Sequence, residues 1–130
     1  MASDRITLTV PARSDYAKTA RMTAAELAGR IGMSFDHIDD VRMAAEEAFV
    51  YACGHHECEG EITFSFEVSD ELLAITVGPF PDSAEEPGAE PEDRYAAFIL
   101  ESVCDEFTIT RESGLCTLRL VKRSLAAVEG

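Results

Sequence analysis

The chain has 130 residues, 46% of them hydrophobic, and its 25 Asp and Glu outnumber 11 Lys and Arg, which gives a net charge of −14. A chain of this length can bury roughly two-thirds of its unfolded surface, so we expect one domain over residues 1–130. The negative charge repels phosphate backbones and anionic lipid heads, which argues against nucleic acid and membranes as partners and favours a basic protein. No export leader and no apolar run of the roughly 18 residues needed to span a membrane is found, so we expect a cytoplasmic protein.

The first quarter of the chain predicts a strand followed by a helix. Residues 5–10 alternate apolar and polar side chains, as a half-buried strand does, and Pro11 is expected to end the strand. Ser14 is predicted to cap a helix whose apolar residues recur at helical spacing. That helix is expected to end near Arg30, because Gly32 follows as a helix stop.

A second helix and a hairpin come next. Ser34 is predicted to cap a helix that reaches about Cys53 and carries an apolar stripe along one side. Residues 61–68 alternate in the manner of a strand, residues 69–70 suit a turn, and residues 72–77 continue as a second strand. The pair is predicted to form a β-hairpin.

The composition then changes abruptly. Residues 79–92 hold four prolines and several acids, which predicts a mobile, acidic, lid-like loop. Residues 95–103 follow helical spacing. A strand is expected from residue 107, with a turn at residues 113–114 that leads into a last strand over residues 115–121.

The order strand, two helices, two strands, loop, helix, two strands contains hairpins rather than regular strand–helix–strand crossovers. This order predicts an α+β fold, namely a two-layer sandwich in which a mainly antiparallel sheet carries three helices on one face.

The segment Met43–His55 reads Met-Ala-Ala-Glu-Glu-Ala-Phe-Val-Tyr-Ala-Cys-Gly-His. It resembles the nucleotide-binding helix of the histidine-kinase-like (Bergerat-fold) ATPases, and most of all that of the anti-sigma-factor serine kinases. In that family a Glu orients or deprotonates the attacking hydroxyl, and an Asn four residues later holds the magnesium that bridges the phosphates. Here Glu47 matches the Glu, while Tyr51, whose phenol is a poor magnesium ligand, stands at the Asn position. Glu47 is therefore a catalytic candidate, and its plainer alternative is a solvated carboxylate on a helix.

Two further family motifs are matched in position but not in residue type. The family's Asp-x-Gly uses the Asp to bind adenine, and here Pro79 stands for the Asp and Pro81 for the Gly. The family's Gly-x-Gly at the start of the last helix exposes backbone N–H groups to the phosphates, and here Arg94 and Ala96 replace the glycines. These positions are the nucleotide-binding candidates that the resemblance implies, and their residue types predict that they do not bind a nucleotide.

The resemblance extends from Ile6 to Val121 and implies a cytoplasmic regulator. Such a regulator binds a sigma factor, often as a homodimer, and is released by an anti-anti-sigma factor. The departures from the motifs predict a protein-binding regulator that uses no cofactor and does not turn over ATP. The alternative is an active ATP-dependent serine/threonine protein kinase that binds ATP and magnesium through unusual ligands.

A separate cluster of possible metal ligands follows the second helix. Cys53, His55, His56 and Cys58 lie within six residues, and thiolate with imidazole is a set that suits zinc. Structural zinc sites usually add a second, distant pair of ligands, which this sequence lacks. We therefore expect no metal, with a buried thiol and solvated histidines at a helix end.

Overall fold

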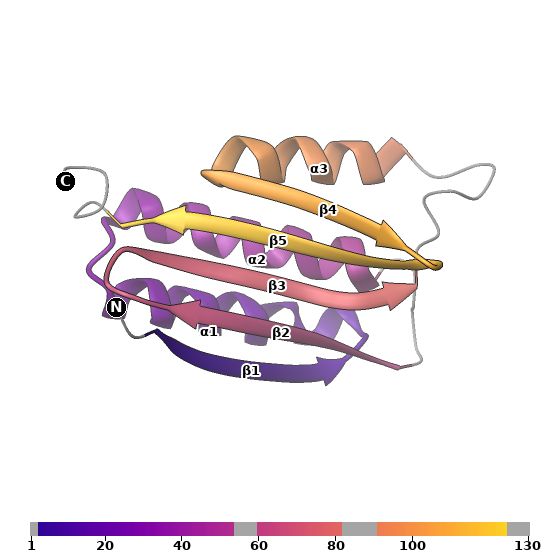
Figure 1. The fold of residues 1–130 in the computed structure, drawn as a ribbon, viewed down its shortest axis with the longest axis horizontal. Helices are drawn as coiled ribbons and strands as arrows, with labels where there is room; N and C mark the ends of the chain where they lie inside the picture. Colours follow the sequence, from indigo (N-terminus) through magenta and orange to yellow (C-terminus); the bar gives the residue numbers. More distant parts are fainter. Residues whose placement is uncertain (1–2, 54–59, 82–90, 125–130) are drawn as a thin grey trace.

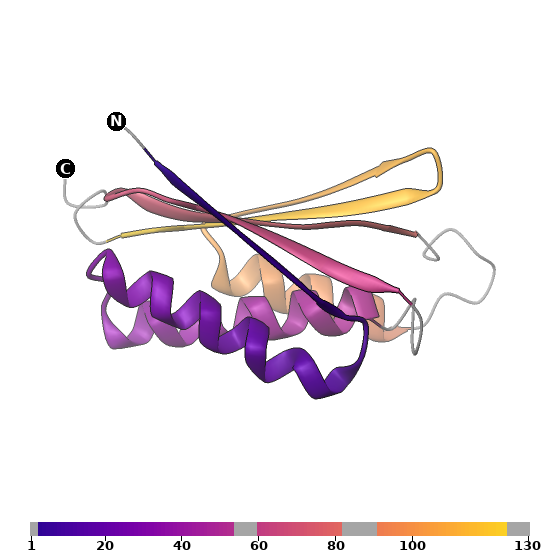
Figure 2. The same cartoon turned by 90° about the horizontal axis from the view of Figure 1, so that it is seen from below.

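The computed structural model describes residues 3–53, 60–81 and 91–124 (Figure 1). In this part of the chain, five strands form one antiparallel sheet, and three α-helices cover one of its faces (Figure 2). This is the two-layer α+β sandwich that the sequence predicts. The elements in chain order are β1 (Asp4–Pro11), a 3-10 turn η1 (Ser14–Tyr16), α1 (Ala17–Arg30), α2 (Phe35–Cys53), β2 (Glu61–Val68), β3 (Leu72–Pro81), α3 (Pro91–Val103), β4 (Glu106–Glu112) and β5 (Leu115–Arg123).

The strands lie in the order β1-β2-β3-β5-β4, and every neighbouring pair is antiparallel. The register places apolar residues of all five strands in one row on the face that the helices cover. That row consists of Ile6, Phe66, Ile75, Leu120 and Phe107. Because side chains alternate between the faces of a strand, the polar residues lie on the opposite face. On that face the hydroxyl oxygens of Thr9 and Thr63 are hydrogen-bonded, 3.0 Å apart.

Small side chains let the first two helices pack closely. Ala20, Ala24 and Ala28 follow one another every four residues on α1, and all three are fully buried. Ala45 and Ala52 are equally buried on α2, which lies beside α1. Alanine has the highest helix propensity and loses no side-chain entropy on burial, so this pattern favours both the helices and their contact.

The two helix starts differ from each other. Ser34 caps α2 as the sequence predicts, because its Oγ accepts a hydrogen bond from the backbone N–H of His37 at 3.2 Å. The predicted cap at Ser14 is wrong. Ser14 begins the 3-10 turn η1, and α1 starts only after Tyr16, which makes no side-chain capping bond. A tight turn therefore links β1 to α1.

Both strands that end in proline are longer than predicted. Pro11 is the last residue of β1 and is paired with Glu61, which is possible because β1 is an edge strand. The predicted loop over residues 79–92 is also too long, because β3 continues to Pro81 and α3 begins ten residues later. Residues 82–90 of that loop lie outside the described residues.

A half-buried ion pair joins the helical layer to the sheet. The Nζ of Lys122 on β5 donates to Asp40 Oδ2 at 2.9 Å on α2 and to the backbone oxygen of Val103 at 3.0 Å, at the end of α3. The Lys122 side chain is only 13% exposed. Burial raises the pKa of the neighbouring Cys104 thiol to about 12, and the Lys122 charge offsets only part of that rise.

The helices of the described part include none that is both long and apolar enough to cross a lipid bilayer.

Candidate functional site

Glu47 and Tyr51 lie on one side of α2, since residues four apart share a helix face. Glu47 is half-buried, and this burial raises the pKa of its carboxyl above 4.5, with repulsion from Glu46 adding to the rise. A carboxylate in such a place can accept a proton from a hydroxyl group. The catalytic role of Glu47 stays a prediction.

Tyr51 connects three elements of the fold. Its side chain is 4% exposed, and its hydroxyl accepts a hydrogen bond from Nη2 of Arg111, on β4, at 3.0 Å. Its ring meets that of Phe80, on β3, edge to face, with the centroids 6.1 Å apart and the planes at 70°. Tyrosine buried in this way has its apolar body packed and its polar tip paired, so the side chain is held in one position.

The end of β3 reaches this site through a bulge. Val77 pairs with Leu118 and Phe80 pairs with Cys116. Between these two pairs β3 advances by three residues, whereas β5 advances by two. The extra residue turns Phe80 onto the covered face of the sheet, where it is 2% exposed.

Pro79 and Pro81, the two positions that the resemblance assigns to adenine binding, are both exposed. Pro79 follows a cis peptide bond from Gly78. The residue from this segment that contacts Tyr51 is therefore Phe80, which lies between the two matched positions.

Arg94 and Ala96 lie within α3 rather than before it. Ala96 is buried and stands beyond the first turn, where a backbone N–H group normally bonds to the helix itself. Because only the first few N–H groups of a helix stay open to a ligand, the position of Ala96 does not offer one to a phosphate. The side chain of Arg94 lies outside what the structure describes.

Sequence reasoning missed two residues of this site, Phe80 and Arg111. Arg111 follows Phe107 and Ile109 at every second position of β4, so the alternation assigns it to the covered face. That signal was present in the sequence, although a charged residue is normally placed on the solvent face. Phe80 had no such signal, because the bulge changes the alternation of β3.

Of the four possible metal ligands, His55, His56 and Cys58 lie in residues 54–59, outside the described residues. Cys53 is buried at the end of α2, as expected. Among the described residues, no group of three or more Cys, His, Asp or Glu side chains is placed to hold a metal ion. Absence of a metal therefore stays a prediction.

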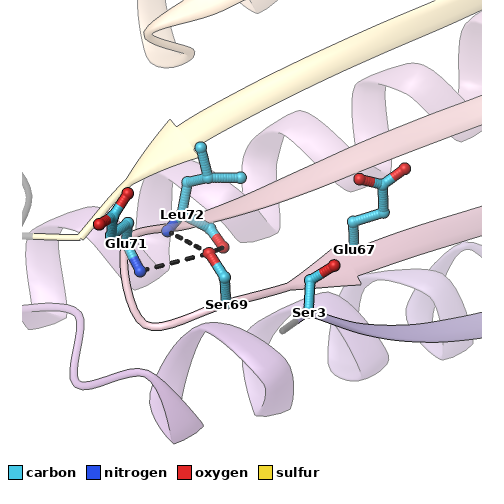
Figure 3. A pocket seen from close by; sticks show the side chains of 5 residues that line it. All are labelled: Ser3, Glu67, Ser69, Glu71 and Leu72. Atoms are coloured by element: carbon cyan, nitrogen blue, oxygen red, sulfur yellow. Dashed lines mark hydrogen bonds between the residues drawn. The ribbon is translucent and has the colours of Figure 1, made fainter. Parts of the chain in front are cut away.

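A hollow of about 470 Å³ lies at the β2–β3 turn (Figure 3), whereas Tyr51 contacts Phe80 at the other end of β3. Figure 3 shows Ser69 inside the turn, where its Oγ accepts hydrogen bonds from the backbone N–H groups of Glu71 at 3.3 Å and Leu72 at 3.2 Å. The carboxylate of Glu67 is paired with Arg5 at 3.2 Å. These polar groups are used within the turn and the sheet, and we assign no ligand to the hollow.

The fold and the position of this site define a class of protein. The sequence profile of the histidine kinase-like ATPase domain matches residues 10–122, and the chain belongs to that family. The resemblance to its anti-sigma-factor serine kinases is confirmed by similarity to serine-protein kinase RsbW of Staphylococcus epidermidis and of Staphylococcus aureus strain JH9. Each is 29% identical over 139 aligned positions, which cover 92% of this chain and 86% of the relative.

A solved structure is also similar. It contains the RsbU and RsbW domains of a Mycobacterium tuberculosis protein, and it superposes with a TM-score of 0.72 at 20% identity. The match covers 93% of this chain and 32% of the solved chain, so this chain spans about a third of the length of that solved chain. At this identity the likeness shows the fold alone.

Proposed function

We propose that this protein is a regulator of the anti-sigma type, which acts in the cytoplasm by binding another protein and without turning over ATP. The observation that carries the proposal is the position of Tyr51. Its hydroxyl is bonded to Arg111 at 3.0 Å and its ring packs on Phe80, at the place where the resemblance expects a magnesium-binding Asn. A phenol held in this way is a poor ligand for a hard cation that prefers carboxylate and water oxygens.

The remaining nucleotide contacts support the same proposal. The adenine-binding carboxylate is replaced by Pro79, and the phosphate-binding glycines by Arg94 and Ala96. Each lost polar contact to a charged group weakens binding by roughly 1.5–3 kcal/mol, so the three losses together reduce affinity by about a thousandfold or more.

The proposed partner is a sigma factor or another regulator of the sigma pathway, with an anti-anti-sigma factor as the protein that releases it. Similarity to RsbW over most of both chains supports this choice, and the net charge of −14 suits a partner with a basic surface. A homodimer is part of the proposal, because the resemblance implies one.

The second candidate is an active ATP-dependent serine/threonine kinase. The raised pKa of Glu47 favours it, because a carboxylate whose pKa is raised toward neutral pH is a better general base. The similarity to serine-protein kinases supports the same candidate.

Calorimetric titration with ATP and magnesium separates the two candidates. We expect no binding in the micromolar range and no transfer of phosphate to a serine of any sigma-pathway protein. Micromolar binding, together with phosphate transfer that is lost in Glu47→Gln, would place the kinase first. The binding role is tested by capture of sigma-pathway proteins at low and high salt, with stronger retention expected at low salt. Recovery of nucleic acid alone, or of nothing, would contradict it.

A further inference from the structure

Several large apolar side chains of α2 and α3 are exposed to solvent. Met43 and Val50 on α2 are 48% and 50% exposed, and Tyr95 and Phe98 on α3 are 67% and 66% exposed. Met43, Glu47 and Val50 are spaced by four and three residues, so they share one face of α2, and Tyr95 and Phe98 are likewise neighbours on α3. We call these five residues the α2–α3 surface.

The two helices bring these residues together. They lie next to each other on the same face of the sheet and run in opposite directions (Figure 1, Figure 2). Lys122 binds both Asp40 and the backbone oxygen of Val103, which fixes these two positions side by side. The two helices have the same rise per residue, so going back along α3 from Val103 matches going forward along α2 from Asp40. Phe98 lies five residues before Val103 and therefore lies opposite about residue 45 of α2. Tyr95 then lies opposite about residue 48, which is next to Glu47.

The charge around this surface is strongly unbalanced. The described side chains of α2 and α3 include six carboxylates and one arginine, Arg42, which is paired with Asp39 at 3.5 Å. Arg21 of α1 reaches Glu46 at 3.5 Å, on the side of α2 that faces α1. No described cation is paired with Glu47, so its charge is available to a partner. The carboxylates among the described side chains of the two helices are Asp36, Asp39, Asp40, Glu46, Glu47 and Glu101.

We propose that the α2–α3 surface is a docking site for a basic amphipathic helix of the partner protein. Its apolar face would cover the two aromatic side chains together with Met43 and Val50, and a Lys or Arg would pair with Glu47. An amphipathic helix laid on an apolar helical surface is a common mode of peptide recognition. This inference rests on the proposed protein-binding function and adds where the partner binds and with what chemistry.

Charge argues against a second copy of this chain as the occupant. A symmetric dimer through this surface would place the carboxylates of α2 and α3 of one copy against those of the other, so the homodimer proposed above would form through another surface. Like charges opposed across an interface cost several kcal/mol. A basic helix would instead bring positive charges to the carboxylates of α2 and α3. Its apolar residues would contact aromatic side chains, a residue type that often dominates the binding energy of an interface.

The test uses a fluorescent peptide of about 18 residues that places Leu and Lys at helical spacing, so that one face is apolar and the other basic. A second peptide has the same composition in scrambled order, which keeps the charge and removes the apolar face. Binding to the wild-type protein, to Tyr95→Ser and to Phe98→Ser is followed by anisotropy. The matched control is Phe35→Ser, because Phe35 is 88% exposed on the same helical layer and lies eight residues, about 12 Å, before Met43.

We expect the amphipathic peptide to bind more tightly than the scrambled one. Each of Tyr95→Ser and Phe98→Ser should weaken that binding about tenfold or more, and Phe35→Ser should change it less than twofold. Equal binding of the two peptides, no binding, or an equal loss in Phe35→Ser would overturn the docking site. So would a change of oligomeric state in Phe98→Ser, measured by light scattering, since a second copy would then cover the surface. If the wild-type protein and Phe98→Ser capture a sigma-pathway protein equally well, the docking site fails while the proposed function stands.

Discussion

Gly78 is expected to tolerate no side chain, and the substitution Gly78→Ala tests how the end of β3 is held. Its φ is +116°, in a region that residues with a Cβ rarely adopt. A Cβ at this position would lie 2.8 Å from the backbone oxygen of Cys116 and 3.0 Å from Cδ1 of Phe80. Neither neighbour moves easily, because Phe80 and Cys116 are paired in the sheet.

Two costs follow for Gly78→Ala. Positive φ costs an L-residue about 1–2 kcal/mol, and forcing an extra carbon into a packed position costs about 1–3 kcal/mol. The sum, roughly 2–5 kcal/mol, is a large part of the 5–15 kcal/mol by which a typical domain is stable. For a chain of this length we expect the melting temperature to fall by about 7–18 °C.

The control is Gly114→Ala, in the β4–β5 turn. Gly114 has a φ of +78°, but a Cβ there would meet nothing within 4 Å, so only the conformational cost of roughly 1–2 kcal/mol applies. Urea unfolding followed by circular dichroism measures the stability of both variants, and near-ultraviolet dichroism reports whether the tyrosine rings, that of Tyr51 among them, keep their packing. Equal destabilisation by the two substitutions would refute the argument, because the close approach to Cys116 would then cost nothing.

Three further outcomes are expected. The stability of Glu47→Gln should match that of the wild type below pH 4.5 and should exceed it progressively as the pH rises through the raised folded-state pKa of Glu47. The reason is that the ionised carboxylate of Glu47 is less favourable in the folded state than in the unfolded state. Unfolding measured at a series of pH values checks this. Lys122→Ala should cost about 1.5–3 kcal/mol by leaving Asp40 and the backbone oxygen of Val103 without their partner, whereas the double variant Lys122→Met with Asp40→Leu should cost less, as urea midpoints will show. The Cys104 thiol, with its pKa near 12, should resist alkylation at pH 8 until the protein unfolds, and stability should decline from pH 9 towards pH 12 as the unfolded thiol ionises first.

Much of the fold could be predicted because its elements are marked by local patterns. The cap at Ser34 and the glycine after α1 fix the boundaries of helices whose apolar residues recur at the right spacing. The β2–β3 turn is marked in the same way by Ser69, whose Oγ binds the backbone of the turn. In each case the group that stabilises the feature lies within a few residues of it, so the sequence contains the whole interaction.

The candidate site was predicted less well because its contacts are distant in sequence. The bond from Arg111 to Tyr51 joins residues 60 apart, and no spacing rule connects them. The bulge that turns Phe80 inward depends on how β3 pairs with β5, which a pattern along β3 alone does not contain. The predicted cap at Ser14 failed for a smaller reason, since a serine after a proline-ended strand also suits the start of a 3-10 turn.

The position of β5 in the sheet has a consequence for how the chain is made. β5 lies between β3 and β4 although it is the last of the five strands to be synthesised, so β3 has no partner on one side until residues 115–123 have left the ribosome. Until then Lys122 is also missing, and Asp40 and the end of α3 have no cation between them. The surface that α2 and α3 form together is therefore expected to take shape only after residues 115–123 have been synthesised, and a shorter nascent chain should expose the unpaired edge of β3 to chaperones.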